Sequence, residues 1–144
     1  MLSHITEERL ADIPAPVDER AFSDELSSAR SHVLDLISRH LTEFGDKFPA
    51  ETCKEGYYPL TENVEWTTSF WTGQLWLAWE MSGEEKFRAM AEKHTRSFGL
   101  RIAGRSDTNT HDLGFLYTLS CVADWRLTGS REARGFSLLA AEAL

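Results

Sequence analysis

An internal repeat of 46 residues is the feature that most constrains how this chain can fold. The segment WEMSG at 79–83 matches WRLTG at 125–129. The same shift aligns three further pairs, Phe70 with Leu116, Trp71 with Tyr117 and Arg88 with Arg134. Each unit is predicted to be a helix, a tight turn whose glycine adopts the left-handed conformation, and a second helix. Helix-pair repeats of about this length are typical of stacked hairpins, in a solenoid or in a closed toroid.

Hydrophobic spacing predicts helices along most of the chain, and no segment shows the clean alternation of a strand. Apolar residues recur close to the helical period over 21–44, and Gly45 is a plausible stop. The segment 46–63 contains prolines and a glycine and is predicted to be a long loop, a kind that is often functional. Further helices are expected at about 66–82, 84–102 and 112–127, and from Ser130 onward. The fold class is therefore expected to be all-α, made of stacked helical hairpins.

Composition and charge exclude several kinds of partner. A chain of 144 residues fits one domain, and its net charge of −8 leaves no basic surplus to bind nucleic acid or an anionic membrane surface. No apolar run approaches the length of a membrane span. The segment Met1–Pro16 has no apolar signal core and is expected to be irregular. Cys53 and Cys121 lie far apart, which favours free thiols in a cytoplasmic protein.

A polar segment enters a predicted helix at His111 and Asp112, which places an imidazole beside a carboxylate. Asp112 could cap the helix, where its charge also meets the positive end of the helix dipole, or could present its carboxylate to a substrate. His111 could be a solvated loop residue or the partner of an acid/base pair. His94 is expected to be a surface residue within a basic group on another helix. No P-loop, GxSxG, HExxH or metal-spaced Cys/His motif occurs.

The repeat connects Asp112 with a tryptophan. A shift of 46 residues maps Trp66 onto Asp112, so both would lie at the start of the first helix of their units. Equivalent positions of stacked hairpins lie on one rim, where an aromatic ring and a carboxylate would face a common cavity. Most of the residues that directly precede Trp66 are polar, which favours an exposed ring that can stack on a sugar. A position in the core is the alternative. Trp76 and Trp79 are expected to be core residues.

Two stretches of the chain resemble the unsaturated glucuronyl hydrolases, glycoside hydrolase family 88. They are EWTTSFWTGQLWLAWE at 65–80 and HDLGFLY at 111–117, and the likeness runs from about Asn63 to the C-terminus. The resemblance implies an (α/α)6 toroid of six helical hairpins, of which roughly two and a half are present. Residues 1–144 are therefore expected to be a single N-terminal fragment of the toroid domain. Its unpaired helix faces make self-association an expectation.

The resemblance also implies a mechanism. Such enzymes act on oligosaccharides, left by polysaccharide lyases, that end in a 4,5-unsaturated uronic acid. They hydrate the C4=C5 bond, and the resulting hemiketal opens to release the sugar, without a metal or organic cofactor. By motif match, Asp112 is one of two essential aspartates, His111 is a pocket residue and Trp66 stacks on the sugar. The second aspartate would lie beyond Leu144.

One departure and two alternatives remain open. The family usually has His-His-Asp, whereas Thr110 stands here in place of the first histidine. A related hydrolase acting on unsaturated rhamnogalacturonyl ends would use the same chemistry on another leaving sugar. A helical-hairpin module that binds protein or carbohydrate without catalysis, with Asp112 only a cap, is the other alternative.

Overall fold

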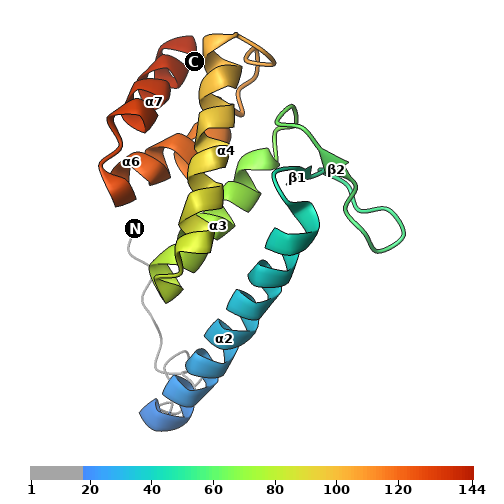
Figure 1. Ribbon diagram of the computed structural model, residues 1–144, viewed down its shortest axis with the longest axis vertical. Helices are drawn as coiled ribbons and strands as arrows, with labels where there is room; N and C mark the ends of the chain where they lie inside the picture. Colours follow the sequence, from blue (N-terminus) through green and yellow to red (C-terminus); the bar gives the residue numbers. More distant parts are fainter. Residues whose placement is uncertain (1–17) are drawn as a thin grey trace, which may run out of the picture. The chain divides into compact units, whose positions relative to one another are not determined.

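The computed structural model describes residues 18–144, so the predicted irregular segment Met1–Pro16 lies outside the described residues. The chain divides into two compact units at Val33 and Leu34. The first unit holds the beginning of helix α2 (Glu19–Phe44), where the Asp18 carboxylate accepts a hydrogen bond of 3.0 Å from the backbone N–H of Arg20. An aspartate at this position is a favoured helix cap. The second unit, 34–144, contains every other element (Figure 1).

The second unit is built almost entirely from helices, which confirms the expected all-α class. Along the chain these elements are β1 (Phe48–Pro49), β2 (Leu60–Thr61), α3 (Thr68–Ser82), α4 (Glu85–Ala103), α5 (Leu113–Tyr117), the π-helical η1 (Thr118–Val122), α6 (Ala123–Thr128) and α7 (Arg131–Ala143). None of the described helices is both long enough and apolar enough to cross a membrane. Both cysteines are free thiols, Cys53 exposed and Cys121 buried.

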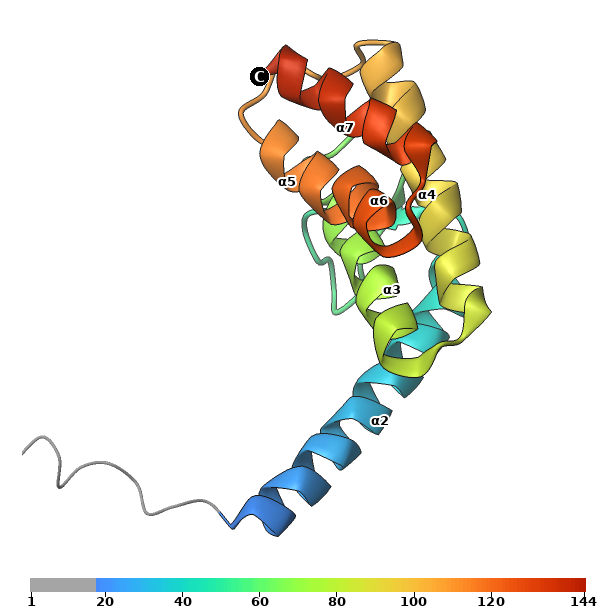
Figure 2. The ribbon, with the colours of Figure 1, turned by 90° about the vertical axis from the view of Figure 1, so that its left-hand side faces the viewer.

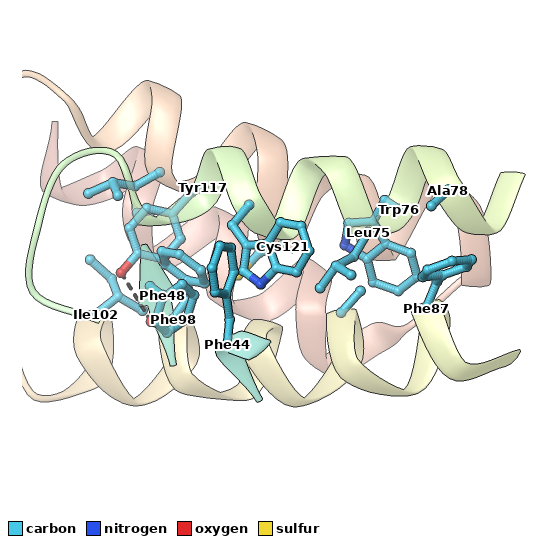
Figure 3. Packing of buried hydrophobic residues seen from close by; sticks show 14 of the residues in the cluster. Phe44, Phe48, Leu75, Trp76, Ala78, Phe87, Phe98, Ile102, Tyr117 and Cys121 are labelled. Atoms are coloured by element: carbon cyan, nitrogen blue, oxygen red, sulfur yellow. Dashed lines mark hydrogen bonds between the residues drawn. The ribbon is translucent and has the colours of Figure 1, made fainter. Parts of the chain in front are cut away.

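Helices α3 and α4 form the first complete hairpin and enclose most of the core. Trp71, Leu75 and Trp76 on α3 are buried against Phe87 and Phe98 on α4. Figure 3 shows Leu75, Trp76, Phe87 and Phe98 between the two helices, with the Tyr117 hydroxyl donating to the Phe98 carbonyl. Helix α3 is apolar on several sides because α4, α5 and η1 all pack against it. Trp76 is a core residue as predicted, and Trp79 is half-buried at the edge of the core.

The second hairpin differs from its prediction in one respect. The helix expected at 112–127 runs from Leu113 to Thr128, but its middle turn, Thr118–Val122, is π-helical. There the Ser120 hydroxyl donates to the Leu116 carbonyl, and a Cβ at Gly73 of α3 would stand 3.3 Å from Leu119 Cβ. A π turn is rare and hydrophobic spacing does not reveal it. Figure 2 shows α5, α6 and α7 lying along the first hairpin.

The structure confirms the repeat. Gly83 and Gly129 end the first helix of each hairpin with φ of 72° and 77°, and their N–H groups donate to the Trp79 and Trp125 carbonyls at 2.7 and 2.9 Å. Arginines 46 residues apart lie over these same tryptophans, with guanidinium-to-ring distances of 5.1 Å for Arg88 and 5.6 Å for Arg134. The two hairpins therefore share a turn geometry and a cation–π contact.

Two sequence-based expectations need correction. The segment 46–63 is not wholly irregular, because Phe48 pairs with Thr61 and Pro49 with Leu60 in a short antiparallel ladder. Phe48 is buried against His94 and Phe98, which holds the segment to the core. His94 is not a surface residue: its side chain is buried and its Nδ1 lies 3.2 Å from the Thr72 hydroxyl. Its basic neighbours are on the outer face of α4, whereas His94 is on the inner face.

Candidate active site

Trp66 lies in the turn that leads into α3, two residues before the helix begins. Its indole N–H donates to Glu51 Oε2 at 2.7 Å, and its ring stands edge-on to Phe70 with 6.2 Å between centroids. The side chain remains 45% exposed. The indole N–H of Trp66 is therefore held by a hydrogen bond, while part of the ring stays accessible to solvent. Such an arrangement suits contact with a sugar.

Asp112 directly precedes α5 but does not cap it with its side chain. Its Oδ2 instead accepts a hydrogen bond of 2.9 Å from the Thr110 hydroxyl, whose oxygen accepts the Asp112 backbone N–H at 3.1 Å. The capping alternative is therefore wrong for the carboxylate. Thr110 supplies a hydrogen bond that orients this carboxylate.

His111 has a different environment from Asp112. Its imidazole is 94% exposed, and Nε2 lies 3.4 Å from Asp112 Oδ1, so the two form an ion pair only when the histidine is protonated. His111 borders a separate apolar hollow, whose other lining residues are Phe70, Gly114, Phe115, Thr118 and Leu119. His111 is therefore next to Asp112 in the chain but lines a different hollow from Asp112.

Trp66 and Asp112 line one hollow of about 390 Å³. Its remaining lining residues are Val64, Arg101, Asp107, Asn109 and Thr110. The prediction that the repeat brings Trp66 and Asp112 to a common cavity is confirmed. His111 is not among the residues of this hollow, although it is next to it. The roles of the three residues in substrate binding and catalysis stay predictions.

Sequence reasoning missed Val64, Arg101, Asp107 and Asn109 among the residues of the hollow, and Arg101 is the buried one. It stands near the end of α4 and is only 6% exposed, whereas an arginine on a helix is ordinarily expected at the surface. Burial lowers the pKa of its guanidinium, although the group stays charged. The available signal was its spacing: Arg101 follows His94 and Phe98 at helical intervals and therefore shares their inner face.

Among residues 18–144, no group of three or more His, Cys, Asp or Glu side chains is placed to hold a metal ion. The polar chemistry of the hollow comes from one oriented carboxylate, one buried guanidinium, and the hydroxyl and amide groups around them. Such a set can bind hydroxyl-rich ligands and move a proton.

Comparison with known proteins gives a consistent result. No family model matches the chain. It is 39% identical over 137 residues to the unsaturated chondroitin disaccharide hydrolase of Streptococcus pneumoniae, covering 95% of this chain and 33% of that protein. It is 39% identical over 111 residues to the unsaturated glucuronyl hydrolase of Bacillus sp. strain GL1, covering 77% of this chain and 29% of that protein.

Solved structures agree with these relatives. The unsaturated glucuronyl hydrolase of Streptococcus agalactiae superposes with a TM-score of 0.81 at 33% identity, over 92% of this chain and 35% of that one. A mutant of that enzyme complexed with dGlcA-GalNAc6S gives a TM-score of 0.80 at 37% identity, over 82% of this chain and 31% of that one.

The repeated hairpins and these structural neighbours define the fold as stacked helical hairpins, part of a helical toroid. The chain is similar to unsaturated glucuronyl hydrolases over most of its own length. It spans about a third of the length of the curated relatives it matches.

Proposed function

We propose that this chain contributes Trp66 and Asp112 to the active site of a glycoside hydrolase that releases 4,5-unsaturated uronic acid from lyase-generated oligosaccharides. The observation that carries the proposal is the hollow shared by these two residues, which are 46 positions apart and belong to successive hairpins. The names of the relatives, which act on unsaturated chondroitin disaccharides or unsaturated glucuronyl groups, support this substrate class.

The reaction is a hydration. A proton adds to C4 of the unsaturated ring, and a water molecule that gives up a proton to a carboxylate adds its oxygen to C5. The hemiketal so formed opens to a ketone at C5 and leaves a hemiacetal at C1. That hemiacetal collapses to an aldehyde and releases the leaving sugar, which completes a net hydrolysis. This differs from the usual attack at the glycosidic carbon between two carboxylates. The overall reaction consumes one water molecule and needs only groups that give up and take up protons.

Asp112 supplies one carboxylate of this scheme. The Thr110 hydroxyl engages Oδ2, so Oδ1 is the oxygen that can exchange a proton or hold a substrate hydroxyl. Trp66 provides the ring on which the sugar stacks, and His111 supplies a donor at the edge of the site. The second aspartate that the resemblance implies would come from another hairpin of the toroid.

The test is a chimera in which this chain replaces the corresponding third of the Streptococcus agalactiae enzyme. Hydrolysis of dGlcA-GalNAc6S is followed by the loss of the ultraviolet absorbance of its double bond. We expect Asp112→Asn to lower kcat by about 10²-fold or more, the usual range for removing a general acid or base. Glu80→Gln is the matched control, because Glu80 is an exposed carboxylate on α3.

The outcomes separate the alternatives. An active chimera that Asp112→Asn leaves unchanged would overturn the assignment of Asp112. Activity on unsaturated rhamnogalacturonyl ends in preference to glucuronyl ends would favour the related hydrolase. Saturable binding of dGlcA-GalNAc6S with no loss of absorbance would favour a non-catalytic module. The two free thiols support a reducing compartment, the cytoplasm, as the place of action.

A further inference from the structure

Arg101 connects the two segments that carry Trp66 and Asp112. Its Nη1 donates to Asn63 Oδ1 at 3.1 Å and to the Glu65 carbonyl at 3.0 Å. Its Nη2 donates to the Val64 carbonyl at 3.1 Å and to the Asp107 carbonyl at 3.3 Å. Three of these acceptors lie in the segment 63–65, directly before Trp66, and the fourth lies in the loop that leads to Asp112.

The physical chemistry of a buried guanidinium makes this connection strong. A charge removed from water must be hydrogen-bonded, and hydrogen bonds from a charged donor are stronger than neutral ones. Among the described residues no carboxylate lies within ion-pair distance of Arg101, so backbone carbonyls and one amide oxygen share its charge. The planar fork of an arginine can satisfy several acceptors at once, which a lysine ammonium cannot do in the same geometry.

The two connected segments differ in their other interactions and in their backbone conformation. Asn63 accepts from the Thr68 hydroxyl at 2.9 Å, which joins the first segment to the start of α3. The second segment contains Arg105 and Asp107, two non-glycine residues with φ of 51° and 49°. The left-handed conformation is unfavourable for such residues and persists where the surroundings hold it. The hydrogen bond from Arg101 to the Asp107 carbonyl acts at this point.

We propose that Arg101 is a positioning residue, which fixes the separation of Trp66 and Asp112 across the hollow by holding both loops to the end of α4. The proposal rests on the proposed function of these two residues. Arg101 acts through the loops, and no contact between it and the substrate is required.

Hydrogen–deuterium exchange of this chain tests the connection without any substrate. In Arg101→Gln, we expect backbone amides of both 63–67 and 106–112 to exchange about tenfold faster, while those of 74–78 in α3 keep their protection. Arg96→Gln, an exposed arginine on the same helix, is the matched control and should change neither segment. If Arg101→Gln does not fold, Arg101→Lys keeps the charge and should loosen both segments by a smaller factor.

Faster exchange in only one segment, in neither, or uniformly across α3 and α4 would overturn the proposal. Binding of dGlcA-GalNAc6S to the chimera then tests the consequence. Arg101→Gln should weaken the Kd about tenfold in the parent chimera, and much less in a Trp66→Ala background, because the arginine acts through Trp66. Equal weakening in both backgrounds would indicate a merely structural role. Absence of binding by the parent would count against the proposed function, while the exchange result still decides whether Arg101 connects the loops.

Discussion

The buried histidine His94 gives this chain a pH-dependent stability. His94 packs against Phe48 with 4.3 Å between ring centroids, and its Nε2 has no hydrogen-bond partner. Burial, together with the neighbouring Lys93 charge, lowers the pKa of His94 from 6.5 to about 4. The unfolded chain therefore takes up a proton at a higher pH than the folded chain. The His94 contribution to stability is complete above pH 6.5 and is lost as the pH falls from 6.5 towards 4.

Replacing this histidine should remove that dependence. We expect the free energy of unfolding of the wild-type chain to fall by roughly 3 kcal/mol more than that of His94→Gln between pH 7 and pH 4. Urea unfolding followed by tryptophan fluorescence at several pH values measures the difference. His32→Gln, at an exposed histidine, should keep the wild-type profile. Parallel curves for wild type and His94→Gln would contradict a neutral buried imidazole.

Thr110 is the residue whose hydroxyl determines the orientation of Asp112. Thr110→Val removes both the donor to Asp112 Oδ2 and the acceptor of the Asp112 N–H. We expect a loss of about 1 kcal/mol in the free energy of unfolding and a decrease of about tenfold in the kcat of the chimera. Thr110→Ser retains the hydroxyl and should restore both values. A kcat unaffected by Thr110→Val would show that this hydrogen bond does not orient the carboxylate for catalysis.

At the scale of the elements, α4 packs closely against α7 because Gly99 has no side chain. A Cβ at Gly99 would stand 2.3 Å from a ring atom of Phe136, whereas a Cβ at Gly135 on α7 would meet nothing within 4 Å. Alanine raises helix propensity at both positions by up to about 1 kcal/mol. At Gly99 the cost of displacing the Phe136 ring exceeds the gain in helix propensity, so we expect Gly99→Ala to destabilise the chain by about 1–2 kcal/mol. At Gly135 no such cost arises, so we expect Gly135→Ala to stabilise the chain. Thermal unfolding of the two variants measures this, and stabilisation by both would refute the close packing.

At the scale of the whole molecule, apolar side chains remain exposed on the first helix of each hairpin. Phe70 and Leu77 on α3 are 41% and 57% exposed, and Phe115 on α5 is 52% exposed. Exposed apolar area of this kind favours association. We expect the chain to self-associate with rising concentration in sedimentation velocity, and Leu77→Lys to weaken that association. Leu100→Lys, at an exposed leucine on α4, is the control, and an equal effect of both would exclude the α3 face.

The whole-molecule pattern was more predictable than the individual polar contacts. The 46-residue repeat predicted both hairpins and the pairing of Trp66 with Asp112, because equivalent turns and helix starts recur at fixed spacing. Arg101 and His94 were missed because a charged or polar residue on a helix is ordinarily assigned to solvent. Their burial depends on hydrogen-bond partners 22 to 38 positions earlier in the chain, which local pattern does not reveal. The side chain of Asp112 does not cap α5, because its Oδ2 accepts a hydrogen bond from the Thr110 hydroxyl instead. Local pattern does not reveal this choice of partner.

The repeated turns at Gly83 and Gly129 have a consequence for how such a protein can change. Each lies at the far end of its helix from Trp66 or Asp112, which for the 15 residues of α3 is about 20 Å. The arginine–tryptophan contacts that accompany the turns are at that same far end. Substitutions around the turns therefore act on folding about one helix length away from Trp66 and Asp112. Under the proposed function, each hairpin separates the end that forms its turn from the end that contacts the substrate.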